Sequence, residues 1–448
     1  MRAFKHQSIL EDGNLALALA PALTPAGIIK EPVFFRGVAL YPQVLARGLL
    51  VLADITSTRY FNYTPESQRD PILSAQGNRL RAECFSACNG VYARLDLLAS
   101  GFEGKIGFGT TNVDIGMDLR SALTQIKQKD KFHLVIGNDG FTTSRLSMVS
   151  EKVTKLEEVV HERPVKMPDR WVRALGNAAE IHRKMKPALT LKGIQAQAFI
   201  TMLPPATGKN QSGWITLTGK SEKLMPRWTR SSAYISGLHR LSALKRVMTN
   251  LSEITFYMQD IKEPGPSMVE VALPGARLTL SLTAESWHGY SGEGALLESL
   301  ANQEVLDDSV NISSALEFEA VIDEAKLSQK WQINESRVQA ALALLAISGR
   351  LGFDVAEQAY FHRELPDDPN RVFKDNPRLV GARKLIENVR YIDENQWVVQ
   401  SRDVDYLVYF DGKTGMEDAR CTCTWYLNHQ NRRGPCKHML AVQLKEES

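Results

Sequence analysis

The chain has 448 residues, of which 44% are hydrophobic and 23% are charged, and its 54 basic and 51 acidic residues give a net charge of +3. This composition is that of a globular protein, and it excludes global disorder, a collagen helix and a long coiled coil. This net charge is too small to bind the whole chain to nucleic acid or to an anionic membrane by charge alone. Five cysteines are too few for a disulfide scaffold, so we expect a reducing cytoplasm.

The longest uncharged apolar stretch near the start covers residues 14–29 and is interrupted by Pro21 and Pro25. It is shorter than the roughly 20 residues that a membrane span needs. Glu11 and Asp12 precede it, whereas a signal peptide begins with positive charge. We therefore expect no membrane association and a cytoplasmic location.

The first 310 residues predict a mixed α+β fold. A buried helix, or a helix that runs into a strand, is expected over residues 44–54, and a further helix is expected after Pro168. Hairpins are expected around Asp139-Gly140 and around Pro274-Gly275, because these dipeptides join runs typical of strands. We divide this region into an α+β domain at residues 1–150 and a second domain, or its continuation, at residues 151–310.

Residues 311–365 change character and outline a winged helix. Helical periodicity covers residues 316–330 and 335–348, and Asn334 is a suitable N-cap for the second helix. Residues 351–363 then predict a two-stranded wing. Helix, turn, helix and wing follow one another in the order of that fold.

The second of these helices carries only two charged residues, Glu335 and Arg337. A helix that reads DNA presents more basic and polar side chains, so we expect a winged helix that contacts protein. The proline-rich and aspartate-rich residues 366–384 predict a linker. Residues 385–448 predict strands followed by a short helix.

In this last segment, three of the five cysteines fall in one stretch of sixteen residues, as Cys421-Thr422-Cys423 and, after twelve intervening residues, Cys436-Lys437-His438. Three thiolates and one imidazole are a complete tetrahedral set for zinc. Side chains two apart on an extended segment share a face, so Cys421 and Cys423 are expected to point together. Cys436 is expected just before the final helix and His438 in its first turn.

A zinc ion with four protein ligands has no open position for substrate, so we expect one structural Zn2+ and no catalysis. His429 lacks a neighbouring cysteine and is interpreted as a loop residue. Trp425 and Tyr426 lie between the two ligand pairs and are candidates to shield the site from solvent. The alternative is that these two pairs are unrelated core residues.

The C-x-C…C-x-H pattern resembles the SWIM zinc finger, which implies a ββα unit at residues 385–448. Other stretches resemble one bacterial family of SWIM-finger proteins, at residues 34–37, 85–96, 109–114 and 359–366. Members of that family are similar in being encoded beside MoxR-type AAA ATPases and von Willebrand factor A-like proteins. The resemblance therefore implies a non-enzymatic adaptor or recognition subunit with such protein partners.

Nucleic-acid binding is the alternative function. Residues 419–444 contain four basic residues, Arg420, Arg432, Arg433 and Lys437, and no acidic one, with Trp425 between them. Basic and aromatic side chains together are typical of a surface that contacts phosphates and bases. The competing interpretation is that these charges lie in a solvated loop and offset the charge of a three-thiolate centre.

The remaining motifs do not favour an enzyme. Cys84 and Cys88 are interpreted as core residues; the alternative is a metal-binding or redox pair, because on a helix they would share a face. Residues 109–114 are interpreted as a turn, with a cation-binding loop as the alternative. Residues 207–209 lack the first glycine of a P-loop, and the His, Ser and Glu of residues 287–294 lie in a glycine-rich stretch.

Overall fold

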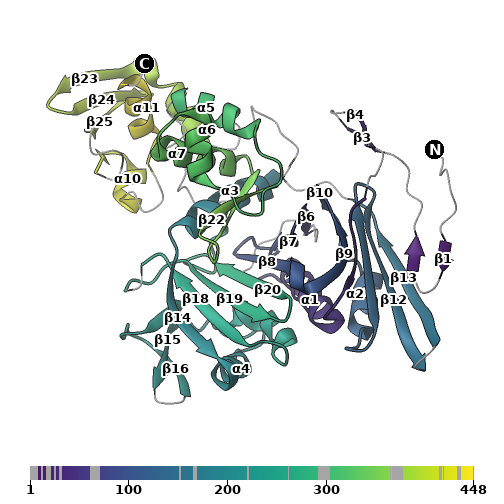
Figure 1. Cartoon of the computed structure of the whole chain (residues 1–448). Coiled ribbons are helices and arrows are strands. Elements are labelled where there is room, and N and C mark those ends of the chain that lie inside the picture. Colours follow the sequence, from purple (N-terminus) through teal and green to yellow (C-terminus); the bar gives the residue numbers. More distant parts are fainter. Residues whose placement is uncertain are drawn as a thin grey trace. The chain divides into compact units, whose positions relative to one another are not determined.

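The computed structural model describes residues 9–11, 14–16, 22–24, 27–29, 33–60, 71–150, 153–164, 169–218, 221–260, 262–290, 303–363, 365, 377–412, 416, 418–430 and 435–446. The chain forms two compact units (Figure 1). The first, called the sheet unit, comprises Met1–Pro168, Lys184–Gly289 and Phe318–Ala320. The second, called the finger unit, comprises Asp169–Arg183, Tyr290–Glu317 and Val321–Ser448.

An antiparallel eight-stranded sheet dominates the sheet unit, with the strand order β10-β6-β7-β8-β20-β19-β18-β14. In that order the strands are Phe108–Asn112, Ile72–Gln76, Arg79–Phe85, Val91–Leu98, Ala276–Leu282, Ser267–Leu273, Glu253–Met258 and Lys186–Lys192. Strands from residues 1–150 and from residues 151–310 therefore pair within one sheet, through β8 and β20.

Two further sheets complete this unit. The five-stranded sheet has the order β13-β12-β11-β5-β9, with strands Val153–Glu162, Gly140–Ser150, Lys131–Gly137, Val33–Ala39 and Phe102–Ile106. The three-stranded sheet has the order β16-β15-β17, with strands Ser221–Met225, Gly213–Thr218 and Ser232–Ile235. Short strands pair as β1 (Ile9–Glu11) with β2 (Asn14–Ala16) and β3 (Ala22–Thr24) with β4 (Gly27–Ile29).

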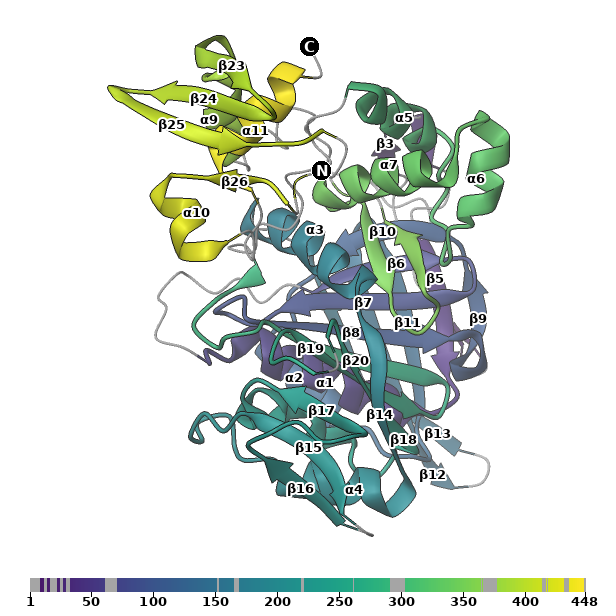
Figure 2. The same cartoon turned by 90° about the vertical axis from the view of Figure 1, so that its left-hand side faces the viewer.

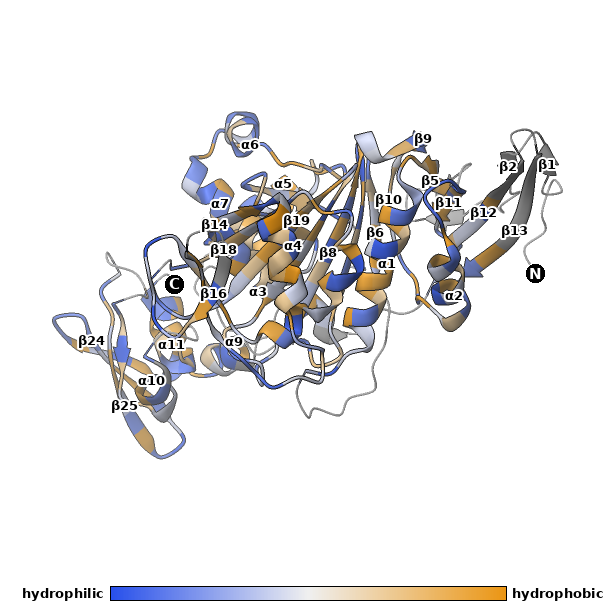
Figure 3. Cartoon of the chain, turned by 90° about the horizontal axis from the view of Figure 1, so that it is seen from below, coloured by the Kyte–Doolittle hydropathy of each residue, from blue (hydrophilic) through white to orange (hydrophobic). Residues whose placement is uncertain are grey.

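Helix α1 (Pro42–Ser57) is the central helix of the sheet unit and packs on β7 and β8. It is apolar on most of its circumference, as expected of a helix inside a core, and Figure 3 shows hydrophobic residues along it. A methyl group at Gly48 would lie 2.8 Å from Leu95 Cδ1, so glycine permits this close approach. The other helices are α2 (Met117–Gln125), α4 (Gly193–Met202) and the 3-10 helices η1 (Ala99–Gly101) and η2 (Leu238–Val247).

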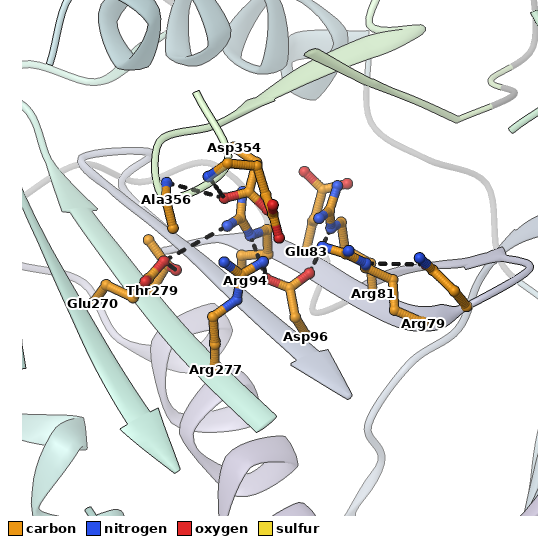
Figure 4. A network of polar contacts seen from close by, with 12 residues as sticks. Arg79, Arg81, Glu83, Arg94, Asp96, Glu270, Arg277, Thr279, Asp354 and Ala356 are labelled. Carbon is orange, nitrogen blue, oxygen red and sulfur yellow. Dashed lines mark hydrogen bonds and ion pairs between the residues drawn. The ribbon is translucent and has the colours of Figure 1, made fainter. Parts of the chain in front are cut away.

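A buried network of ion pairs crosses the middle strands of the eight-stranded sheet (Figure 4). The Asp96 carboxylate accepts from Arg81 Nε at 2.5 Å and from Arg94 Nε at 2.9 Å, and all three side chains are at most 1% exposed. The Tyr92 hydroxyl donates to Glu83 Oε1 at 2.6 Å. The strand register places Arg81 opposite Asp96 and Glu83 opposite Arg94. Complementary charges on adjacent strands therefore pair where water is excluded.

The structure confirms several local predictions in this unit and corrects one. The helix at residues 44–54 and the hairpins around Asp139-Gly140 and Pro274-Gly275 form as expected. Cys84 lies on β7 and not on a helix, so it shares no helical face with Cys88; both are buried, as expected of core residues. Residues 108–112 are strand β10 and not a turn, because they pair with β6.

The finger unit begins with helices packed around α7 (Glu335–Ile347). These are α3 (Asp169–Arg183), α5 (Gln303–Ser313) and α6 (Glu324–Trp331). Asn334 caps α7, as expected, by accepting from Arg337 N at 2.9 Å. The hairpin of β21 (Leu351–Asp354) and β22 (Ala359–His362) follows, at the position of the expected wing. The winged-helix assignment itself stays a prediction.

The helix expected over residues 316–330 begins only at Glu324. Asp323 accepts from Lys326 N at 3.1 Å and so caps α6 at that point. Residues 318–320 belong to the sheet unit, where the Phe318 ring lies 6.4 Å from the ring of Phe108. Tertiary packing there overrides the helical periodicity of the sequence.

The C-terminal part of the finger unit is a four-stranded antiparallel sheet with helices beside it (Figure 2). Its elements are α9 (Pro377–Arg383), η4 (Ile386–Asn388), β23 (Val389–Asp393), β24 (Gln396–Ser401), β25 (Val404–Tyr409), β26 (Arg420–Cys421), α10 (Thr424–His429) and α11 (Lys437–Glu446). Helix α9 lies within the segment expected to be a linker, and it packs on α11. Among the described residues, no helix has the length and apolar character needed to cross a bilayer.

Candidate metal centre

Local structure brings the four predicted ligands together from three elements. Cys421 ends β26, and Cys423 follows in extended conformation as the N-cap of α10. Cys436 directly precedes α11, and His438 lies in the first turn of that helix. The extended segment and the helix start thus present their side chains to one point, as the spacing predicted.

The geometry of this cluster suits a tetrahedral metal ion. One ligand atom from each of Cys421, Cys423, Cys436 and His438 lies within 4.8 Å of the others, and the four residues are 2% to 5% exposed. The His438 Nδ1 atom is 3.8 Å from Cys421 Sγ and 3.9 Å from Cys436 Sγ. Tetrahedral zinc bonds of about 2.3 Å to sulfur and 2.0 Å to nitrogen separate such atoms by about 3.6 Å. The donor set and its spacing therefore fit zinc.

The three thiols perturb one another strongly. Hydrogen bonds from Cys421 and then from Cys436 lower the pKa of Cys423 far below its ordinary value. The hydrogen bonds to Cys423 and Cys436 raise the pKa of Cys421 far above its ordinary value. The hydrogen bond with Cys421 lowers the pKa of Cys436, but the interaction with Cys423 and burial outweigh it and raise that pKa to about 12. A divalent cation at the centre of the cluster would stabilise all three thiolates.

Comparison with known proteins supports this assignment. Residues 406–445 match the SWIM zinc finger family. The chain carries a SWIM zinc finger. The family match and the Cys3His cluster together indicate zinc binding. None of the curated proteins matches the chain.

Two solved structures resemble 56% of this chain, and each resemblance covers 98% of the other chain. One is a PCNA2–PCNA3 complex from Sulfolobus tokodaii, with 10% sequence identity and a TM-score of 0.40. The other is the Proliferating Cellular Nuclear Antigen from Entamoeba histolytica, with 11% identity and a TM-score of 0.36. These values are too low to carry an argument about function.

Tyr406 orients the histidine ligand of the SWIM finger. Its ring stacks on the imidazole of His438 with centroids 4.1 Å apart and an angle of 18° between the planes. Tyr406 is not among the site residues that the sequence pattern predicted. The two-residue periodicity of strand β25 could have identified it, because this periodicity places Tyr406 on the same face as the buried Val408.

Arg378 connects the two halves of the ligand set from helix α9. Its Nη1 donates to the carbonyl oxygen of Pro435 at 3.0 Å, directly before Cys436. Its guanidinium also lies 4.4 Å from the ring centroid of Trp425, two residues after Cys423. The Trp425 side chain is partly buried and packs against the guanidinium of Arg378. Nothing in the local sequence around Arg378 indicated this role.

The other predicted contact residues occupy different surroundings. Arg420 is exposed on β26. Lys437 is half-buried, and its Nζ donates to Ser401 Oγ at 3.1 Å. Arg432 and Arg433 lie outside the described residues. The structure does not bring these residues together as one described basic surface of the SWIM finger.

The sheet of the SWIM finger exposes apolar side chains. Leu407 is 41% exposed and pairs across the strands with Val398, while Tyr409 is 40% exposed and pairs with Arg420. These four residues alternate with inward-facing ones and so share the outer face of the sheet. Figure 3 shows the resulting mixture of hydrophobic and hydrophilic residues along β24 and β25. Such a face is suited to contact with another molecule.

Proposed function

We propose that this chain is a non-enzymatic, zinc-dependent interaction protein, in which one structural zinc ion holds the SWIM finger as a recognition surface. The observation that carries the proposal is the closed cluster of Cys421, Cys423, Cys436 and His438, each at most 5% exposed. Four protein ligands leave zinc no position for water or substrate. Zinc bound there would cross-link β26, α10 and α11, which are too small to fold on apolar burial alone.

A protein partner accounts best for the outer face of the finger sheet. Val398, Leu407 and Tyr409 supply apolar and aromatic contact area there, and Arg420 lies beside them. Tyrosine, arginine and apolar side chains are typical of the centres of protein interfaces. The resemblance to SWIM-finger proteins encoded beside MoxR ATPases and von Willebrand A-like proteins supports those two classes as partners. A cytoplasmic adaptor or recognition subunit fits this set of partners.

The helical part of the finger unit supports the same function. Helix α7 buries most of its length, and Arg337 near its start pairs with Asp308 through two bonds of 2.8 and 2.9 Å. A recognition helix for DNA needs such side chains free to reach bases. If α5, α6, α7 and the β21–β22 hairpin form a winged helix, it is one that contacts protein.

The proposal is tested by natively purifying the full chain, measuring its metal and identifying its partners. We expect about one zinc per chain, lost in a Cys436→Ser/His438→Ala variant and kept in Cys84→Ser, which changes a buried cysteine outside the cluster. A Leu407→Ala/Tyr409→Ala variant is expected to keep zinc and lose the ATPase partner. A chain without stoichiometric zinc would contradict the metal assignment. Partner capture that is unaffected by the Leu407/Tyr409 change would contradict the assigned surface.

Nucleic-acid binding by the finger is the second candidate, and the exposed pair of Arg420 and Tyr409 favours it. An arginine beside an exposed ring can contact a phosphate while the ring stacks on a base. Binding of a labelled oligonucleotide should then fall with salt and weaken on Arg420→Ala. Absence of binding at low salt removes this candidate.

A further inference from the structure

The distribution of charge along the chain is strongly uneven. Residues 184–252, called the basic segment, contain eleven lysines and arginines and one acidic residue, a net charge of +10. The other 379 residues contain 43 basic and 50 acidic residues, a net charge of −7. The chain's net charge of +3 therefore conceals one strongly basic segment, and this segment lies wholly within the sheet unit.

The fold gathers part of this charge on the three-stranded sheet. Lys223 on β16 and Ser232 on β17 both pair with Thr216 on the central strand β15, so all three side chains share one face. Thr229 of the β16–β17 loop lies over this face, because its Oγ1 donates to Thr216 Oγ1 at 3.1 Å and its N donates to Ser232 Oγ at 3.2 Å. The loop is thereby fixed beside Lys223.

The residues around Thr229 are cationic and aromatic. Arg227, Trp228, Arg230 and Lys223 are exposed, with the Trp228 side chain 39% accessible. Among the described residues, no carboxylate forms an ion pair with Lys223, Arg227 or Arg230. These four residues are called the Trp228 surface.

A fourth cation, Lys262, reaches this surface from the connection that follows β18. Lys262 Nζ lies 5.9 Å from the centroid of the Trp228 ring. This connection also carries two acids, Glu263 and Asp260, and Asp260 Oδ1 accepts from the backbone N of Lys262 at 2.8 Å. Figure 1 and Figure 2 both show β15 and β16 next to α4 at one end of the sheet unit.

We infer that the Trp228 surface binds single-stranded nucleic acid, with Trp228 stacking on a base and Arg227, Arg230 and Lys223 contacting the neighbouring phosphates. Exposed arginines that have no acidic partner in the described part of the chain keep their full charge for phosphates, which they can contact through two parallel bonds. An exposed indole between them offers a flat face that any base can cover, and single strands leave their bases free to do so. An acidic protein would use the charge but has no need of the ring, so the combination favours a polynucleotide. This surface is separate from the SWIM finger.

The test measures fluorescence anisotropy of a labelled oligothymidylate or oligouridylate of about twenty nucleotides with the full chain over a range of salt concentrations. We expect Trp228→Ala to weaken binding by about 5- to 150-fold at every salt concentration. We expect Arg227→Ala/Arg230→Ala to reduce the slope of log affinity against log salt by about 1.4, because two phosphate contacts are lost. The matched control, Lys127→Ala/Lys129→Ala, removes two exposed charges of the sheet unit outside the basic segment and should leave the slope unchanged.

Several outcomes would overturn the inference. These are no binding at low salt, a loss in the Lys127/Lys129 control equal to that in the Arg227/Arg230 variant, or tighter binding of poly-glutamate or of phosphatidylserine vesicles than of the oligonucleotide. Loss of binding in Arg420→Ala with none in the Arg227/Arg230 variant would assign the nucleic acid to the SWIM finger instead. Because all the changed residues are exposed, unchanged circular dichroism and melting temperature are expected for each variant.

Discussion

Replacing Arg378 by alanine is expected to weaken zinc binding, although Arg378 is not a ligand. Its guanidinium contacts Trp425 and the Pro435 carbonyl, and so joins the segment after Cys423 to the segment before Cys436. A hydrogen bond from a charged donor contributes about 1.5 to 3 kcal/mol. A partly buried cation–π contact contributes about 0.5 to 2 kcal/mol.

These contributions should appear in the zinc affinity because the finger folds as it binds metal. In a structural zinc site, the free energy of the contacts that form on folding adds to the apparent binding free energy. Taking about 2 kcal/mol as the lower end of the combined contribution, Arg378→Ala should weaken zinc binding by about 30-fold. The zinc affinity of Arg378→Lys should lie between those of the wild type and Arg378→Ala, since lysine keeps the charge but not the planar guanidinium.

The assay is competition for zinc between the full chain and a chromophoric chelator, with tryptophan fluorescence as a second readout. Lys384→Ala is the matched control, because Lys384 is exposed just after α9 and makes no described ion pair. Equal zinc affinities of the wild type, Arg378→Ala and Lys384→Ala would refute the assigned role of Arg378.

Three further predictions concern the buried groups. Asp96→Ala removes a buried carboxylate that pairs with Arg81, Arg94 and Arg277, and should destabilise the sheet unit by about 3 to 5 kcal/mol in urea unfolding; a change below 1 kcal/mol would contradict this. Tyr406→Ala should weaken zinc binding by removing the ring stacked on the histidine ligand, whereas Tyr406→Phe should not, and chelator competition separates the two. Because the finger folds as it binds zinc, its three cysteines have ordinary thiol pKa values of about 8.5 before the metal is bound, so zinc must displace about three protons at neutral pH. Zinc affinity should therefore rise by about three decades per pH unit near pH 7 and be lost as the pH falls; calorimetry in buffers of different ionisation enthalpy counts these protons, and zero released protons would contradict the prediction.

The sequence by itself determined the ligand set of the finger. Cys421 and His438 are only seventeen positions apart, and the periods of strand and helix decide which side such near neighbours face. The same local rules located α1, the two hairpins and the cap of α7 at Asn334. In each case the deciding contacts lie within one or two elements of the chain.

Only the tertiary structure decided what surrounds these elements. Arg378 reaches Pro435 across 57 positions, and β8 pairs with β20 across nearly 200, so no period or spacing in the sequence relates them. The helix expected from residue 316 begins at Glu324 because residues 318–320 pack in the sheet unit. The small net charge concealed the basic segment, and only the folding of β15, β16 and β17 showed which of its cations meet at Trp228. Local periodicity specifies the face of an element, whereas its partner is selected by the burial and pairing of residues far apart in the chain.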